Sequence, residues 1–377
     1  MNNKSQQLTA DKSLHIAKDQ PLSQSDIFGQ LKICLGENSC SLAKIDGRNV
    51  IEYSANGKTI ILLSKAITYL GNPHPPFKKR IQLSDWYQDF ALNHSDLDVR
   101  FIGVYHYDDN IVFVDFCKET YLTHGLHNSS AHVYVNDLYQ GMTFGKFEKI
   151  DNSGNNLIIV RFDKFKEYLD GGIEVSDDLF ELFRKFNCGY PFGEWLYALD
   201  IIKEMHDNEW RHWRQAEWAG WFLEYKFNKF ATENHTERQM RYIGGDFDIR
   251  FEEDDFYGDL KASDIDKTEA VGNDQNTLID YLYRYDKFWY IIYEHQTVKD
   301  DTKGYEATIE RNRYIKSIDP KYQKGEMSYY QRMKHSVKFT KMTIVELNRI
   351  NYGGALRTFH QGHQVSGAAR NPKGNYI

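Results

Sequence analysis

The chain has 377 residues, of which 41% are hydrophobic and 15% aromatic, and its formal net charge at pH 7 is −7. This length suggests two domains or one large one, and the apolar content excludes a globally disordered protein. No apolar run approaches the roughly 18 consecutive residues that a membrane-spanning helix needs. The negative net charge argues against a protein that binds polyanions over its whole surface.

Residues 1–25 are polar and contain no apolar segment of the kind found in secretory signals, so we expect them to form a flexible lead-in. No CxxC spacing occurs among the cysteines, which argues against both a zinc cluster and a disulfide framework. They are Cys34, Cys40, Cys117 and Cys188. These features predict a cytoplasmic protein with reduced thiols.

Residues 26–170 have mainly strand-like patterns and are interpreted as a β-rich domain that recognises DNA. The segment 49–64 predicts a hairpin, because two β-prone runs flank an Asn-Gly turn at Asn56 and Gly57. Further strands are expected at 99–107, 110–116, 131–136 and 156–162. A proline-rich loop before Lys78 leads into a short basic run.

Residues 171–377 alternate between helical and strand-like patterns, which predicts a second domain. Helices are expected at 177–186, within 193–233 and at 276–286, and a buried strand at 287–295. The acidic segment 246–261 is expected to form two strands joined by a turn. The predicted fold class is therefore α/β (α+β), with a mixed sheet flanked by helices in the C-terminal domain and a β-rich N-terminal domain.

Charge is unevenly distributed in this second part. Residues 246–266 contain nine acids against two basic residues, whereas residues 301–377 contain fourteen Lys and Arg against six acids. An acidic centre followed by a basic region suits a metal-dependent enzyme that acts on a phosphate backbone, although uneven surface charge is also common.

The segment "GGDFDIRFEEDDFYGDLKAS" contains the strongest chemical signal. Side chains alternate between the two faces of a strand, so Asp246 and Asp248 share a face, and Asp259 and Lys261 share a face of the next strand. Pairing the two strands brings an Asp beside Asp259. Two convergent carboxylates are a suitable Mg²⁺ site, because this ion prefers oxygen ligands and keeps several waters. The lysine ammonium would then orient a water molecule or stabilise the transition state.

This segment resembles the core of the PD-(D/E)xK nuclease superfamily, which includes many type II restriction endonucleases. The family pairs an Asp on one strand with a (D/E)xK motif on the next, here Asp259, Leu260 and Lys261. The Pro that usually leads the motif is absent. Asp248 is the favoured first ligand because it directly precedes an apolar residue, and Asp246 is the alternative. The resemblance implies that the Leu260 carbonyl also contacts the metal.

The resemblance extends to neighbouring segments and covers roughly residues 215–295. Many members of the superfamily present a Glu from an upstream helix, for which Glu224 is the first choice and Glu217 the second. The two are seven residues apart and therefore share roughly one helical face. Alternatively, all these charged residues are exposed and solvated, as we expect for the acidic turn 252–255.

Several basic residues are candidates for contacts with DNA phosphates, which position a protein without reading sequence. They are Lys78, Lys79, Arg80, Arg332, Lys334, Lys338, Lys341 and Arg357. The polar C-terminal stretch 357–377 is expected to be either an arm that touches DNA or a disordered tail. The Trp residues at 210, 213, 218 and 221 are expected to pack in the core, with base stacking as the alternative.

The sequence thus predicts a Mg²⁺-dependent type II restriction endonuclease that cuts double-stranded DNA as a homodimer, with a possible cognate DNA methyltransferase acting on the same site. The catalytic residues would be Asp248, Asp259, Lys261 and Glu224. Two alternatives remain open: a nuclease of repair, recombination or phage defence with the same core, and a DNA-binding protein without catalytic activity.

Overall fold

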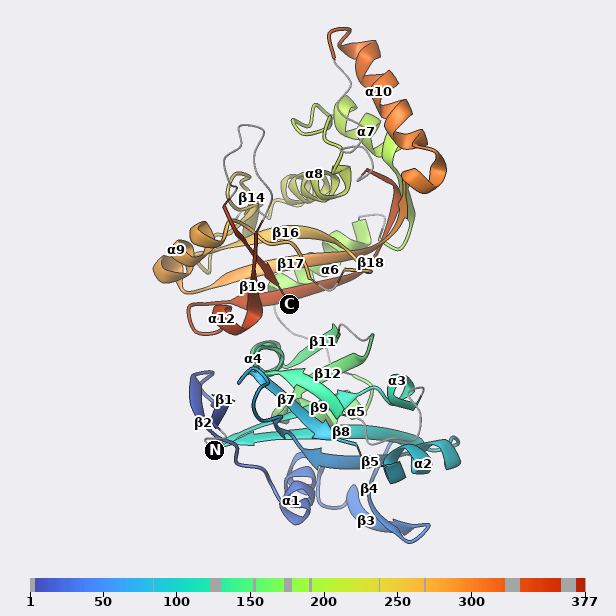
Figure 1. Ribbon diagram of the computed structural model, residues 1–377, viewed down its shortest axis with the longest axis vertical. Coiled ribbons are helices and arrows are strands. Elements are labelled where there is room, and N and C mark those ends of the chain that lie inside the picture. Colours follow the sequence, from blue (N-terminus) through green and yellow to red (C-terminus); the bar gives the residue numbers. More distant parts are fainter. Residues whose placement is uncertain are drawn as a thin grey trace. The chain divides into compact units, whose positions relative to one another are not determined.

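The computed structural model describes residues 4–83, 85–122, 130–151, 154–172, 178–189, 192–236, 238–267, 269–322, 333–360 and 371–376. The chain divides into two compact units, Met1–Val175 (unit 1) and Ser176–Ile377 (unit 2), and each contains helices and sheets (Figure 1). The protein therefore has a mixed α/β fold. None of the helices in the described ranges is both long and apolar enough to cross a membrane.

The described part of unit 1 is built on a mixed seven-stranded sheet. In sheet order the strands are β11 (Lys146–Ile150), β12 (Asn156–Arg161), β9 (Asn110–Phe116), β8 (Asp98–Tyr107), β5 (Lys58–Ala66), β4 (Arg48–Ala55) and β3 (Cys40–Ile45). β5 and β8 are parallel and the other neighbours are antiparallel. The predicted hairpin is confirmed: Asn56 and Gly57 join β4 to β5 with φ of 54° and 74°. Positive φ at both positions is what a type I′ turn requires.

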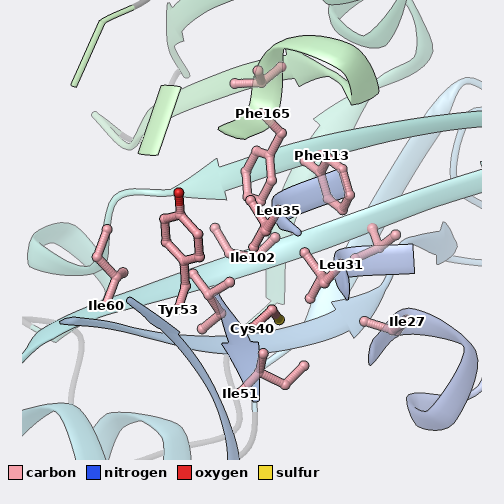
Figure 2. Close-up of a cluster of buried hydrophobic side chains, with 13 residues drawn as sticks. Ile27, Leu31, Leu35, Cys40, Ile51, Tyr53, Ile60, Ile102, Phe113 and Phe165 are labelled. Atoms are coloured by element: carbon pink, nitrogen blue, oxygen red, sulfur yellow. The ribbon is translucent and has the colours of Figure 1, made fainter. Parts of the chain in front are cut away.

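Helix α1 (Gln24–Leu35) packs on this sheet through one apolar face. It begins at Ser23, whose side chain and that of Asp26 form a capping box. Ile27, Leu31 and Leu35 recur at every fourth residue and are fully buried (Figure 2). Each such side chain contributes about 1.5–3 kcal/mol by leaving water.

The other elements of unit 1 complete the core and a second, smaller sheet. They are β6 (Thr68–Tyr69), β7 (Lys78–Gln82), α2 (Asp85–Asn93), α3 (Lys118–Leu122), β10 (Ser130–Tyr134), α4 (Val135–Phe144), η1 (Phe162–Lys164) and α5 (Phe165–Leu169). Strands β10, β7 and β6 form the smaller sheet in that order. Phe165 of α5 stacks on Phe113 of β9 with ring centroids 4.1 Å apart, which joins α5 to the core cluster (Figure 2).

The expectation of a flexible lead-in at residues 1–25 is wrong for most of the segment. β1 (Lys4–Leu8) and β2 (Leu14–Lys18) form an antiparallel hairpin. Lys79 anchors it, because its Nζ lies 3.0 Å from Ser5 Oγ, 3.1 Å from Gln7 Oε1 and 2.7 Å from Asp19 Oδ1. The polar residues that suggested flexibility include Ser5, Gln7 and Asp19, which are the hydrogen-bond partners of the buried Lys79 ammonium group.

The described part of unit 2 is built on a mixed six-stranded sheet. In sheet order the strands are β13 (Trp195–Tyr197), β18 (Lys334–Leu347), β17 (Phe288–Lys299), β16 (Phe256–Asp264), β15 (Ile249–Phe251) and β14 (Met240–Tyr242). β16 and β17 are parallel, whereas the other neighbours are antiparallel. Helix α9 (Gln275–Tyr285) lies between them in the chain, as a parallel pair requires a crossover. Strand β14 was not predicted from the sequence.

The helices and remaining strands of unit 2 flank this sheet (Figure 1). They are α6 (Asp178–Gly189), α7 (Ala198–Asp207), α8 (Trp218–Glu233), η2 (Asp301–Lys303), α10 (Glu306–Ile318), α12 (Tyr352–Ala355), β19 (Leu356–Phe359) and β20 (Lys373–Tyr376). The expected helices at 177–186 and 276–286 and the strand at 287–295 are confirmed as α6, α9 and β17. Helix α8 contacts β14 and β16, which places its side chains beside the acidic segment (Figure 1).

Candidate active site

The pairing of β15 with β16 brings two acidic side chains together. Ile249 is the register partner of Gly258, and Asp248 N donates to Gly258 O at 3.2 Å, so Asp248 lies at the start of β15 beside Asp259. The two residues are 8% and 2% exposed, respectively. Asp248 Oδ2 also accepts a hydrogen bond of 3.0 Å from Leu260 N. The alternative residue Asp246 is exposed and precedes the strand.

The short distance between the two carboxyl groups affects the pKa of Asp248. Burial raises the pKa of Asp248 well above its usual value, and the adjacent Asp259 carboxyl raises it further. Lys261 partly compensates, because its Nζ lies 2.8 Å from Asp259 Oδ2. Burial alone would lower the pKa of Lys261, but the carboxylates of Asp259 and Asp248 outweigh it and raise that pKa. Lys261 is therefore a fixed positive charge in the site.

Helix α8 presents Glu224 to the same place. Glu217, Gly220, Trp221 and Glu224 line one cleft, since residues separated by three, four and seven positions share a helical face. Glu224 Oε2 accepts a hydrogen bond of 2.8 Å from the Tyr242 hydroxyl. Burial raises the pKa of Glu224 to about 7, against the opposing effect of this hydrogen bond. Glu217 is more exposed and stands just before the helix.

The cleft has a volume of about 700 Å³ and contains every residue predicted for catalysis or metal binding. It also contains residues that the sequence did not single out as site residues, among them Arg211, Asn273 and Lys373. Arg211 and Asn273 belong to common residue types in segments without a motif, so the sequence offers no signal for them. The Tyr242 hydroxyl that binds Glu224 was missed for the same reason, since the chain has 26 Tyr. Lys373 lies in the stretch 357–377, for which the sequence predicted an arm that touches DNA or a disordered tail, but it was not named there as a site residue.

The four tryptophans predicted to pack in the core lie in different environments, and Trp210 is only partly buried. Trp213 and Trp218 are buried, at 8% and 0% exposure, which confirms that prediction for these two. Trp221 instead lines the cleft, where its ring stacks on that of His212 with centroids 3.9 Å apart. An aromatic surface is thus available beside the acidic residues.

The donor set fits a small, hard cation. Asp248 and Asp259 supply buried carboxylate oxygens whose mutual repulsion a cation would relieve. Leu260 N–H donates to Asp248, which directly precedes β15. In a strand the carbonyl of a residue faces the same side as its N–H, so the Leu260 carbonyl faces the side of Asp248. Among the described residues no group of three or more His, Cys, Asp and Glu is arranged to hold a metal ion. A cation here would therefore also need oxygens from water and substrate, as Mg²⁺ usually does.

The predicted acidic turn at 252–255 is confirmed as a turn, and Glu253, Asp254 and Asp255 are exposed. Arg250 bonds Asp255, and Arg241 bonds Glu252. These acids lie at the turn of the β15–β16 hairpin, whereas Asp248 lies at its opposite end. They are therefore not part of the cleft lining.

Lys79 is not available to contact DNA, which corrects the prediction for this residue. It is 0% exposed, because alternate side chains of β7 point to opposite faces and Lys79 faces the hairpin of β1 and β2. Lys78 and Arg80 share the other face, where Arg80 Nη1 donates to Ser130 Oγ at 3.0 Å. These two remain candidates for phosphate contacts.

The basic candidates of unit 2 differ in exposure. Arg357 has a 72% exposed side chain and pairs with Glu269 at 2.9 Å. Lys338 and Lys341 lie in β18 and are partly exposed. Arg332 lies outside the described residues.

Lys334 is also directed inward, contrary to its prediction as a DNA contact. Its Nζ lies 3.1 Å from Nε2 of His295, which is 0% exposed. Burial lowers the pKa of Lys334. Burial, reinforced by the Lys334 charge, likewise lowers the pKa of His295 to about 3. The neutral imidazole accepts from Lys334, and its other nitrogen lies 2.9 Å from Thr297 Oγ1.

This arrangement predicts an acid sensitivity of unit 2 that depends on His295. Between pH 6.5 and about 3 the unfolded imidazole binds a proton that the folded one does not, so stability falls as pH falls. A single such group changes stability by at most roughly 1.4 kcal/mol per pH unit in this range. We expect the melting temperature of the native chain to fall more steeply from pH 7 to 5 than that of His295→Gln. His360→Gln is the control, because His360 is exposed. An equal change of melting temperature with pH in all three proteins would refute the prediction.

Part of the chain is similar to a known protein family. Residues 58–169 match the family model described as Methylase-associated X1. The matched segment lies within unit 1 and does not include the cleft. The match suggests an association with a restriction-modification system. No curated protein shows significant similarity to the chain.

Proposed function

We propose that the protein is a Mg²⁺-dependent type II restriction endonuclease that hydrolyses double-stranded DNA at a specific sequence. The observation that carries the proposal is the convergence of Asp248, Asp259, Lys261 and Glu224 in one cleft, although they come from three separate elements. Buried acids next to a half-buried lysine are costly for folding, and perturbed groups of this kind gather at functional sites.

The order of elements around the cleft supports the proposal. α8, β14, β15, β16, α9 and β17 follow one another along the chain, and the four strands are neighbours in the same order in the sheet. This order of a helix Glu, an Asp beside a strand and the Asp259-Leu260-Lys261 motif supports the proposal, because the resemblance to PD-(D/E)xK nucleases implies the same order. The Methylase-associated X1 match adds a restriction-modification context from a different part of the chain.

In the proposed reaction a water oxygen attacks the scissile phosphorus in line with the leaving group. The bond from phosphorus to the 3′ oxygen breaks, the 3′ oxygen takes a proton, and the products carry 5′-phosphate and 3′-hydroxyl ends. Asp248, Asp259 and the Leu260 carbonyl would hold Mg²⁺, which when bound neutralises phosphate charge and lowers the pKa of a bound water.

The protein groups supply positioning and proton transfer. The Lys261 ammonium is fixed by Asp259 at 2.8 Å and donates hydrogen bonds to the attacking water or to the developing charge on the phosphate. Glu224, with a pKa of about 7, is suited to exchange a proton near neutral pH. Cutting both strands at one site requires two such centres, so we propose a homodimer. Unit 1 would recognise DNA, and a methyltransferase would protect the same sequence.

The proposal is tested by incubating the purified chain with unmethylated plasmid and phage DNA in Mg²⁺. We expect discrete fragments, and no fragments when EDTA removes the ion. Diffuse or structure-dependent cutting would instead indicate a repair, recombination or phage-defence nuclease. Binding without cutting under all divalent ions would indicate a DNA-binding protein and would refute the proposed activity.

A further inference from the structure

The end of the chain is built into the cleft wall. β20 pairs with β19 on one side and bridges to Ala270 and Asp274 on the other. Four backbone hydrogen bonds join residues 372–376 to the segment 270–275. Gln275 N donates to Pro372 O at 2.9 Å, and Gly374 N donates to Asn273 O at 3.1 Å. Ala270 N donates to Tyr376 O and Tyr376 N donates to Ala270 O, each at 3.1 Å. The last described residues are therefore an ordered strand between β19 and the segment that precedes α9.

The backbones at this contact approach too closely for side chains. A Cβ added to Gly272 would lie 1.8 Å from the carbonyl oxygen of Gly374. Asn375, which is 3% exposed, holds the contact from the other side, since its Nδ2 donates to Glu269 Oε2 at 3.2 Å. Packing of this kind fixes the position of β20 relative to the cleft.

Lys373 is the residue of β20 that lines the cleft, beside Asn273, Asp274 and Thr277. Among the described residues, six Asp and Glu side chains line this cleft against three Lys and Arg side chains, namely Arg211, Lys261 and Lys373. A DNA backbone entering such a cleft is repelled by the excess negative charge, so a cation on the wall has a large effect on its binding.

We propose that β20 delivers Lys373 to the cleft as a positioning residue that contacts a DNA phosphate next to the scissile one. This inference rests on the proposed nuclease function. It adds that DNA binding depends on β20, which lies outside the Asp259-Leu260-Lys261 motif. The contact is to the backbone, so it strengthens binding on every sequence and does not select bases.

The test compares native chain, Lys373→Ala and Lys373→Arg with Lys303→Ala, an exposed lysine outside the cleft lining. Binding to a fluorescent duplex is measured in EDTA over a range of salt concentrations. Loss of one phosphate contact lowers the slope of log K against log salt by about 1, and we expect this for Lys373→Ala. Lys373→Arg and Lys303→Ala should keep the native slope. With Mg²⁺, Lys373→Ala should raise KM and leave kcat close to native.

The outcomes separate this inference from the proposed function. A native chain that cuts DNA, with an unchanged salt slope and KM in Lys373→Ala, would overturn the role of Lys373 alone. A native chain that binds but never cuts would overturn the nuclease proposal, and the salt slopes would still decide the phosphate contact. A drop in kcat at unchanged KM would also contradict a positioning role.

Discussion

Replacing Asp259 by Asn or Lys261 by Ala is expected to lower kcat for DNA cleavage by about 10³-fold or more, because Asp259 would hold the ion and Lys261 would act on the water or the phosphate. Asp259 contributes a carboxylate to the proposed ion site and holds Lys261 at 2.8 Å. The two substitutions should therefore be far from additive, since either one disturbs the same pair. Cleavage rates of the single and double variants under saturating DNA provide the measurement.

Folding must be separated from catalysis in this experiment. Asp259→Asn keeps the shape of a side chain that is 2% exposed. It relieves the crowding of two carboxyl groups but also removes the ion-pair partner of Lys261, so we expect a folded variant that melts close to the native temperature. It should also weaken Mg²⁺ binding, measured by calorimetry without DNA. Asp246→Asn is the matched control, because this exposed residue lines the same cleft outside β15. Native cleavage rates in folded Asp259→Asn and Lys261→Ala would show that the site has been misassigned.

Lys79→Ala is expected to destabilise unit 1 by about 3–5 kcal/mol, the usual cost of removing one partner of a buried ion pair. The substitution deletes an ammonium group that is 0% exposed and leaves Asp19 Oδ1, Ser5 Oγ and Gln7 Oε1 without their shared donor. The Asp19 side chain is 18% exposed, so water can partly replace the lost partner and the lower end of the range is expected. Chemical unfolding followed by aromatic fluorescence measures the change.

Lys78→Ala is the matched control for this prediction. It removes the neighbouring lysine from the opposite face of β7, where Lys78 has no side-chain hydrogen bond or ion pair with another described residue, and should change stability by less than about 0.5 kcal/mol. Hydrogen exchange should show that Lys79→Ala releases the β1–β2 hairpin, whereas the sheet of unit 2 keeps its protection. Equal stability of the two variants would mean that the buried cluster contributes little to folding.

Features governed by local geometry were predictable from the sequence. The Asn-Gly turn between β4 and β5 follows from the positive φ that these two residues tolerate. The common face of Asp259 and Lys261 follows from the period of two along a strand, and the exposed turn at 252–255 follows from four consecutive acids. Each of these depends on residues within a few positions of one another.

Other features depend on contacts that no local pattern encodes. The sequence favoured Asp248 over Asp246 through a resemblance, whereas the different burial of these two residues depends on where β15 begins and how it pairs with β16. The order of preference between Glu224 and Glu217 was derived from a resemblance, whereas their different burial arises from the packing of α8 beside β14 and β16.

The amino-acid sequence by itself determined the acidic motif, its alternation along a strand and the mixed fold class, because backbone geometry and hydrophobic period act over short distances. Only the tertiary structure decided which lysine of the run 78–80 is buried, that residues 4–18 form a hairpin around it, and that Lys373 reaches the cleft. Lys79 and Ser5 are 74 positions apart, and Lys373 lies 112 positions from Lys261. Such pairs meet only after the sheets have assembled, since burial and charge pairing are properties of the packed chain and not of the local sequence.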